Sequence, residues 1–208
     1  MKGRWVLLFF LSCPSLLLAG PIEEAYKASY QAEALGNLES AIKAVMPLYQ
    51  KYPNGYTLNY RLAWLFYNQG ALANADFHFK KTLVISPTAI ENRLLYASML
   101  NTQKRWAELE QLALEMVKTD YYQYGANLYL VTSLQVQGKF ELAKKVSLKM
   151  LALYPTNTQF LQELGEAQNS LGEADAALRV FTDLLVLQPD NLEAQSAIKA
   201  LAPSAQLH

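Results

Sequence analysis

Few side chains in this chain of 208 residues could carry out catalysis. A general acid–base or nucleophilic site needs a titratable group within hydrogen-bond reach of a second reactive group. The chain has two histidines, His78 and His208, and its one cysteine is Cys13. We expect His78 to be a partly buried or surface residue of a helix, and His208 is the last residue. The sequence therefore predicts neither a catalytic site nor a metal site, and we expect a non-enzymatic protein.

Two pairs of acidic residues, Glu23 with Glu24 and Glu108 with Glu110, could suggest catalytic carboxylates. Both pairs fall in segments with the pattern of amphipathic helices, where solvated charge is the usual explanation. The glycines are spread at long, regular intervals, whereas a phosphate-binding loop needs several of them within one short turn. No cofactor is predicted.

The charge of the chain is balanced, with 18 basic and 18 acidic residues. Binding to nucleic acid needs a basic field that contacts phosphates, so a nucleic-acid partner is not expected. Cys13 lies near the N-terminus, and if an N-terminal signal segment is cleaved off, the mature chain contains no cysteine. Such a chain tolerates an oxidising compartment and holds neither a disulfide nor a thiolate metal site.

Residues 1–19 have the pattern of a secretory signal peptide. Lys2 and Arg4 precede an apolar run over residues 5–11, and small residues follow before the polar part of the chain. Cleavage is predicted after Ala19. This places the mature protein in the periplasm or outside the cell, as part of the bacterial cell envelope.

Two other fates of this segment stay open. It could remain as an uncleaved anchor, although the apolar run over residues 5–20 is shorter than the ~20 residues that a membrane span needs. It could also be lipidated at Cys13, because residues 10–13 loosely resemble a bacterial lipobox. In every case only this segment contacts the membrane, and the rest of the chain leaves the cytoplasm.

A period of 34 residues runs through the rest of the chain. Three residue types recur at this spacing, and all three are missing from the same unit. The recurring residues are Pro53, Pro87, Pro155 and Pro189, then Gly36, Gly70, Gly138 and Gly172, and Ala41, Ala75, Ala143 and Ala177. In the remaining unit their places are taken by Tyr121, Lys104 and Leu109. A fixed period of this length predicts stacked repeats rather than a single globular core.

Each unit has room for two helices. In the second unit, apolar residues at helical spacing fill residues 57–68 and 72–85, on either side of Gly70. We expect the glycine to adopt a positive φ at the turn and Ala75 to let the two helices approach closely. Pro87 is expected to end the second helix, because proline has no backbone N–H to donate.

This pattern resembles the tetratricopeptide repeat. The second unit carries the residues typical of that repeat at Leu62, Ala63, Phe66, Gly70, Ala75, Phe79 and Pro87. The resemblance covers residues 22–191 without insertion and implies an all-α fold, a right-handed α-solenoid of five helix-turn-helix units. The five units are 22–55, 56–89, 90–123, 124–157 and 158–191.

Two units depart from the pattern. In the third unit Leu109 stands where the other units have alanine, and Ala113 stands where phenylalanine is usual. This exchange roughly conserves volume, so we expect a shifted helix crossing rather than a broken repeat. In the first unit Pro47 lies inside the second helix, where it removes a backbone hydrogen bond and is expected to kink the helix.

Residues 192–208 are predicted to form a capping helix and a tail. Apolar residues recur on one helical face of this segment, and we expect them to cover the last repeat. They are Leu192, Ala194, Ala197, Ile198 and Leu201. No equivalent helix is predicted before Ile22, so the signal segment, a partner or a second copy could cover the first unit, and self-association is possible.

The resemblance also implies a binding groove, because the first helix of each such unit lines the concave face. The candidate groove residues are Tyr26, Tyr30, Tyr60, Trp64, Tyr67, Asn68, Asn101 and Gln135. The aromatic residues lie in the first two units and the amides follow, so the groove changes from aromatic to polar along its length. Aromatic rings with a polar tip bind extended chains well. The alternative, that these rings pack as core between adjacent helices, stays open.

Two functions follow as hypotheses. The resemblance implies a non-enzymatic scaffold or adaptor of the bacterial cell envelope that binds a protein or peptide partner in its concave groove. The alternative is a polysaccharide-binding module of an envelope export or assembly machine, with sugar rings stacked on the groove aromatics.

Overall fold

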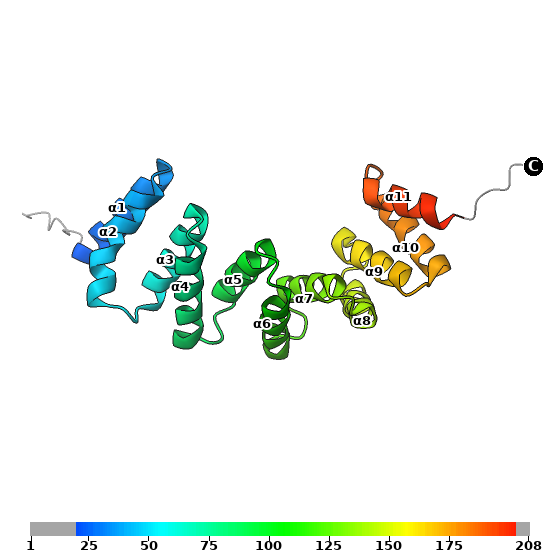
Figure 1. Cartoon of the computed structure of the whole chain (residues 1–208), viewed down its shortest axis with the longest axis horizontal. Helices are drawn as coiled ribbons and strands as arrows, with labels where there is room; N and C mark the ends of the chain where they lie inside the picture. The colour runs from blue at the N-terminus through cyan, green and yellow to red at the C-terminus, as the bar shows by residue number, and fades with distance from the viewer. Residues whose placement is uncertain (1–19, 203–208) are drawn as a thin grey trace, which may run out of the picture.

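The computed structural model describes residues 20–202, and the predicted signal segment and the tail beyond residue 202 lie outside this range. The described chain is all-α, as predicted, and its helices follow one another in an elongated row (Figure 1). The helices are α1 (Pro21–Ala34), α2 (Leu38–Lys51), α3 (Tyr56–Gln69), α4 (Leu72–Ile85), α5 (Ile90–Thr102), α6 (Trp106–Thr119), α7 (Tyr124–Val136), α8 (Phe140–Leu151), α9 (Thr158–Ser170), α10 (Ala174–Leu187) and α11 (Leu192–Leu201).

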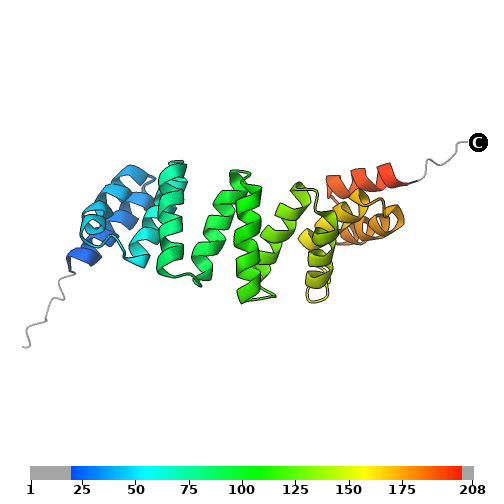
Figure 2. The same cartoon turned by 60° about the horizontal axis from the view of Figure 1, so that its bottom comes forward.

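The helices pack in consecutive pairs. α1 packs on α2, α3 on α4, α5 on α6, α7 on α8 and α9 on α10, and each pair also contacts the next. In a second view the row again runs in chain order from α1 to α11 (Figure 2). Because each pair contacts only its neighbours in the chain, the predicted α-solenoid is confirmed.

The turns within the pairs have the expected backbone conformation. Gly36, Gly70, Gly138 and Gly172 have φ between 72° and 80°. At the turn after α3, the N–H of Ala71 donates to the carbonyl oxygen of Phe66 at 2.9 Å, which closes the end of the helix. Lys104 adopts the same left-handed conformation with φ 57°, although it carries a side chain. The third unit therefore keeps the turn and accepts backbone strain at Lys104.

Small residues lie where the two helices of a pair meet. Ala41, Ala75, Ala143 and Ala177 are fully buried, as the close approach requires. In the third unit both Leu109 and Ala113 are fully buried as well, so the exchange of a large for a small residue keeps both positions in the core. In the fifth unit a Cβ atom on Gly165 would lie 2.7 Å from the Phe181 ring, so α9 and α10 approach closely there.

Pro47 lies inside α2 without ending it, because the helix continues to Lys51. Proline removes one hydrogen bond of the helix, and the exposed position of Pro47 leaves the freed carbonyl of the preceding turn near solvent. Several helix starts are stabilised by side-chain caps, in which an asparagine oxygen accepts a hydrogen bond from the backbone N–H three residues on. These caps are Asn37, Asn157 and Asn191.

The core is divided along the row rather than gathered in one centre. One cluster of buried side chains joins α1, α2 and α3 around Val45 and Leu62. A larger one extends from α3 to α9 around Phe79 and Leu130. A third joins α9, α10 and α11 around Phe181.

The last helix covers the fifth pair, as expected of a cap. Ala194 is buried, and Ala197, Ile198 and Leu201 pack against the third cluster. Leu192 was expected on the same face, but it is the first residue of α11 and is 73% exposed. At the other end of the row Leu35 is 86% exposed, and self-association through the first unit stays a prediction.

None of the helices in residues 20–202 is long and apolar enough to span a membrane.

Candidate functional site

Hydrogen bonds join the first helices of successive units, so these helices share one face of the solenoid. We call this the first-helix face. Partners lie about one repeat apart, and the pairs are Trp64 with Glu33, Tyr56 with Glu91, Tyr67 with Thr102, Tyr124 with Gln159, and Thr132 with Glu163. These bonds hold α1 to α3, α3 to α5, and α7 to α9 in register.

Four of the predicted aromatic residues come together between α1 and α3. They line a cavity of about 520 Å³, which we call the aromatic pocket, formed by Tyr26, Tyr30, Thr57, Tyr60, Arg61 and Trp64. The rings of Tyr26 and Tyr30 lie 6.4 Å apart. Tyr30 is 55% exposed, so one wall of the pocket is open to solvent.

Arg61 forms the floor of the aromatic pocket. It is almost fully buried, and its guanidinium donates to the hydroxyl of Ser29 and to the Glu33 carboxylate. Its Cζ atom lies 3.9 Å from the centroid of the Tyr30 ring, a cation–π contact. A buried charge needs a partner, and Glu33 and Ser29 supply one here. Three of the five guanidinium N–H donors are therefore bonded within the chain, and these bonds fix the Arg61 side chain.

Trp64 is held in the same network. Its indole N–H donates to Glu33 Oε1 at 2.6 Å. Burial alone would raise the pKa of Glu33, but the hydrogen bonds from Trp64 and Arg61 leave that pKa below its usual value. Glu33 therefore stays ionised at neutral pH and fixes both side chains. The indole ring is half-buried, so Trp64 is both a support of the α1–α3 contact and part of the pocket wall.

Two predicted groove residues lie apart from this pocket. Tyr67 packs against the large core cluster, and its hydroxyl is 3.2 Å from that of Thr102 in the next unit. Tyr67 thus has the packing contacts that the alternative describes, and a role of Tyr67 in binding stays a prediction. Asn68 is exposed and donates to the carbonyl oxygen of Trp64 in its own helix.

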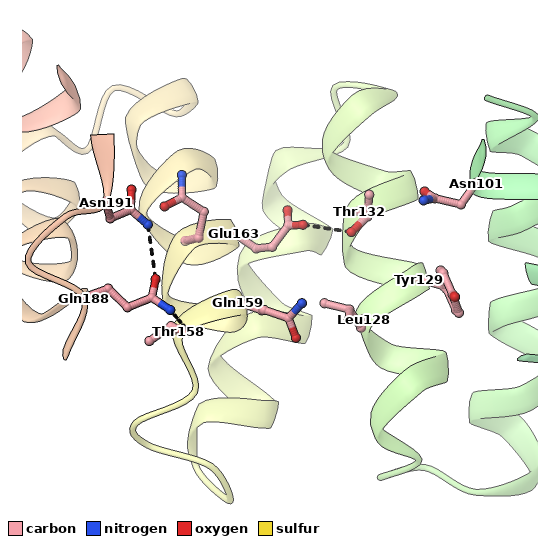
Figure 3. A pocket seen from close by; sticks show the side chains of 10 residues that line it. Asn101, Leu128, Tyr129, Thr132, Thr158, Gln159, Glu163, Gln188 and Asn191 are labelled. Atoms are coloured by element: carbon pink, nitrogen blue, oxygen red, sulfur yellow. Dashed lines mark hydrogen bonds between the residues drawn. The ribbon is translucent and has the colours of Figure 1, made fainter. Parts of the chain in front are cut away.

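Of the three predicted amides, Asn101 belongs to a second cavity, further along the first-helix face. This cavity of about 370 Å³, which we call the polar cleft, is lined by Asn101, Leu128, Tyr129, Thr132, Thr158, Gln159, Gln162, Glu163, Gln188 and Asn191. Figure 3 shows these side chains along the face from the turn before α11, across α9 and α7, to Asn101 on α5. Gln135 does not line the cleft itself, but it donates to the carbonyl oxygen of Glu163 at 3.3 Å.

Glu163 is the titratable group of the polar cleft. Its carboxylate accepts a hydrogen bond from the Thr132 hydroxyl at 2.8 Å (Figure 3). Burial raises the pKa of Glu163 to about 7, and the nearby charge of Glu166 acts in the same direction while the Thr132 bond opposes it. A carboxyl group of this kind exchanges a proton near neutral pH without large cost.

Sequence reasoning missed Arg61 and Glu163 as parts of these cavities. A signal was present, because each is a charged residue inside the apolar pattern of a first helix. Arg61 follows Glu33 by 28 residues, and Glu163 follows Thr132 by 31, close to the 34-residue period. Charged residues separated by nearly one repeat are candidates for contacts between units.

Two other expectations need correction. His78 was expected to be partly buried or at the surface, but it is buried: its Nδ1 lies 2.9 Å from Asn59 Oδ1, and its ring stacks on Phe66. Glu110 was expected to be solvated, but its side chain is only 15% exposed and pairs with Lys139. Glu108 is half exposed, as expected, and pairs with Arg105. These contacts are structural, since none of them lies in either cavity.

No group of three or more His, Cys, Asp or Glu side chains suited to a metal ion occurs within residues 20–202. The aromatic pocket offers ring faces beside a fixed cation, and the polar cleft offers amide and carboxylate oxygens.

No protein-family model matches the chain, and no curated protein matches it in sequence. Solved structures do match it in fold. MamA (residues 41 to the end) from Desulfovibrio magneticus RS-1 superposes with a TM-score of 0.73 at 17% identity, over 84% of this chain and 98% of that one. A tetratricopeptide repeat protein from Parabacteroides merdae gives a TM-score of 0.79 at 17% identity, over 88% of this chain and 73% of that one.

A third solved structure is YrrB, described as a tetratricopeptide-repeat protein with an unusual peptide-binding site. Its TM-score is 0.74 at 14% identity, over 84% of this chain and 90% of that one. These likenesses extend over most of the row of paired helices, and they agree with the positive-φ turns and buried alanines described above. The chain therefore has the fold of the tetratricopeptide-repeat proteins.

Proposed function

We propose that this chain is a non-enzymatic scaffold that binds a protein or peptide partner on its first-helix face, with the aromatic pocket as the main anchor site. The observation that carries the proposal is the geometry of that pocket. Its rings surround a cavity of about 520 Å³, and Arg61, Glu33 and Trp64 hold its floor through bonds within the chain. A pocket that is already ordered loses little entropy when a partner binds.

The chemistry of the pocket favours a large apolar or aromatic side chain as its occupant. Aromatic residues in open pockets are frequent anchors of protein interfaces. The charge of Arg61 is already paired with Glu33, and three of its five N–H donors are bonded to Ser29 and Glu33, so a ligand carboxylate gains less there than beside an unpaired arginine. YrrB, which has a similar fold, is described as having a peptide-binding site, and this supports a peptide as partner.

A display library of short peptides, followed by binding measurements on single peptides, tests this proposal. Selected peptides should share a large apolar residue. Tyr30→Ala should weaken their binding by about 1–3 kcal/mol, because it removes one wall of the pocket. Tyr122→Ala is the matched control, since Tyr122 is also about half exposed, at 49%, but lies outside the pocket. Equal binding by both variants would contradict the proposal.

An oligosaccharide array tests the alternative that the ligand is a polysaccharide. The rings of Tyr26, Tyr30 and Tyr60 could also stack on sugars. Saturable binding of an oligosaccharide that is lost in Tyr30→Ala, without any peptide binding, would replace the peptide by a polysaccharide as the ligand.

We further propose that the protein works in the bacterial cell envelope, a proposal supported by the signal-like pattern of residues 1–19. Mature protein from an envelope fraction should begin at Gly20, because the small residue Ala19 precedes the expected cleavage point. Mass spectrometry of the intact mature chain measures this directly. A chain that retains residues 1–19, or one that carries a diacylglyceryl group on Cys13, would contradict cleavage after Ala19.

A further inference from the structure

Asn92 on α5 is a buried polar side chain without a hydrogen-bond partner. It has no exposed surface, and neither its Nδ2 nor its Oδ1 atom is bonded to another group within residues 20–202. A carboxamide carries two N–H donors and one carbonyl acceptor, and leaving them unpaired in the interior is unfavourable. Burial of Asn92 therefore destabilises the contact in which it takes part, and an arrangement that lets water reach the amide removes this cost.

The 34-residue period shows which contact this is. The residues at the same position of the other helices are all buried and apolar: Leu58 in α3, Ala126 in α7, Phe160 in α9 and Ala194 in α11. This position faces the preceding unit, because Leu58 packs in the cluster that joins α3 to α1 and α2, and the ring of Phe160 lies 5.6 Å from that of Tyr124. Asn92 therefore places an amide at the junction between the second and third units.

Other polar groups of α5 are poorly paired as well. Five of the nine buried side-chain nitrogen and oxygen atoms that lack a partner within residues 20–202 belong to α5 or to Gln103, which follows it. Besides the two atoms of Asn92 they are Nη1 of Arg93, Oδ1 of Asn101 and Nε2 of Gln103. Nη1 of Arg93 lies 3.6 Å from the Glu115 carboxylate, which is an ion pair but too long for a hydrogen bond. The unfavourable burial is thus concentrated in the helix that begins the third unit.

The side-chain bonds that cross this junction lie at or near the surface. On the first-helix face the Tyr56 hydroxyl donates to Glu91 at 2.8 Å. On α4, Asp76 accepts from the Tyr96 hydroxyl at 2.8 Å and from the Arg105 guanidinium at 2.7 Å. Bonds of this kind are exchanged for bonds to water at modest cost. They therefore hold the closed junction without preventing it from opening.

A buried apolar contact also joins the two units. The rings of Phe79 and Tyr96 stack with their centroids 5.4 Å apart, and both side chains are buried. An apolar contact has no directional bonds, so it persists when neighbouring units rotate against each other by a small angle. The junction thus combines an unpaired amide and exchangeable surface bonds with a contact that serves as a pivot.

We propose that the junction between the second and third units is the hinge of the solenoid. The first two units, which carry the aromatic pocket, move together on one side of it, and the last three units, which carry the polar cleft, move together on the other. Rotation at the hinge brings water to Asn92 and changes the distance between the two cavities. The other junctions stay closed because apolar residues fill the equivalent positions.

Distances between spin labels on residues 20–208 test the hinge. This part of the chain contains no cysteine, so labels attach only at introduced cysteines. Four pairs of exposed positions, related by the 34-residue period, each cross one junction: Glu39 with Ala73, Ala73 with Ala107, Ala107 with Glu141, and Glu141 with Asp175. Double electron–electron resonance measures the distribution of distances in each pair. The pair Ala73 with Ala107 crosses the hinge, and the other three pairs are its matched controls.

The distribution for Ala73 with Ala107 should be about twice as wide as the other three. Asn92→Leu keeps the shape of the side chain and removes the unpaired amide, so it should narrow this distribution to the width of the controls. The reciprocal variant Leu58→Asn should widen the distribution for Glu39 with Ala73. Thermal melting checks that both variants are folded. Equal widths for all four pairs in the parent protein, or an unchanged width for Ala73 with Ala107 in Asn92→Leu, would overturn the proposal.

Discussion

Lys104 occupies a turn position that four other units give to glycine. Its φ of 57° lies in the left-handed region, where a Cβ atom is crowded by the backbone. The hydrogen bonds of the turn are nevertheless made, because the N–H of Arg105 reaches the carbonyl oxygen of Leu100 at 2.9 Å. The packing of α5 and α6 therefore imposes a conformation that the residue itself disfavours.

Lys104→Gly should stabilise the protein by about 0.5–1 kcal/mol, because relief of the strain exceeds the added entropy of glycine in the unfolded chain. Urea unfolding measures the change. Lys104→Ala is the control: it removes the same charge and keeps the Cβ atom, so the stability should stay close to that of the parent. A gain in both variants would show that the charge, rather than the backbone, is responsible.

Two buried titratable residues have shifts of pKa in opposite directions. Burial lowers the pKa of His78 from 6.5 to about 4, with the charge of Lys81 adding to the effect. Burial raises the pKa of Glu163 from 4.5 to about 7. The contribution of neutral His78 to the free energy of unfolding is fully present above pH 6.5 and is lost as the pH falls towards 4. The stability from protonated Glu163 is complete below pH 4.5 and is lost as the pH rises towards 7.

Between pH 5 and 6.5 these two contributions therefore oppose each other, and the parent protein should show a nearly flat stability. Glu163→Gln removes one of them. In this variant the free energy of unfolding should fall by about 1 kcal/mol per pH unit between pH 6.5 and 5, because the unfolded His78 takes up its proton over this range. Urea unfolding at several pH values measures the slope. The same flat profile in the variant would mean that His78 can be protonated in the folded protein.

At the scale of the helix pair, close approach depends on small side chains at a few contact points. Ala75 has no exposed surface between α3 and α4, and Gly165 leaves room for the Phe181 ring between α9 and α10. Interiors packed to this density do not absorb extra methylene groups without movement. The spacing of the two helices in a pair is thus set by these residues.

Ala75→Leu should lower the free energy of unfolding by about 1–3 kcal/mol, because the larger side chain forces α3 and α4 apart. Ala73→Leu makes the same change two residues earlier on the exposed side of α4 and should have little effect. Thermal melting of the two variants in parallel makes the comparison. Equal melting temperatures would show that Ala75 is not a contact point between the helices.

At the scale of the whole molecule, stability is distributed along a row. The three clusters of buried residues lie one after another, and α11 contributes Ala194 and Ile198 only to the last of them. In such an array the stability is close to a sum of contributions from units and from the contacts between neighbours. Damage at one end should therefore stay near that end.

Removal of residues 192–208 should weaken the fifth unit while the second unit keeps its protection. Hydrogen exchange is the suitable measurement: amides of α9 and α10 should exchange faster, and those of α3 and α4 should be unchanged. Removal of residues 203–208 alone leaves α11 in place and serves as the control. A uniform loss of protection over all helices would show that the row unfolds as one cooperative unit.

The amino-acid sequence by itself determined the all-α repeat fold, because its signals are local and recur. A glycine that needs positive φ, an alanine at a helix contact and a proline after a helix each act within a few residues, as at Gly70, Ala75 and Pro87. The sequence also predicted that Leu109 and Ala113 exchange a large and a small side chain without breaking the repeat, and both residues are buried. The helix spacing of the aromatic residues placed Tyr26, Tyr30, Tyr60 and Trp64 together for the same reason.

Only the tertiary structure decided which side chains from different units meet. It brought Glu33 to Arg61 and Trp64, separated Tyr67 from the aromatic pocket, and buried His78 beside Asn59. The physical reason is that these contacts depend on the rotation of one helix pair against the next, which a one-dimensional pattern does not encode. The same rotation places Thr132 against Glu163, and burial there produces the shifted pKa that no residue spacing could predict.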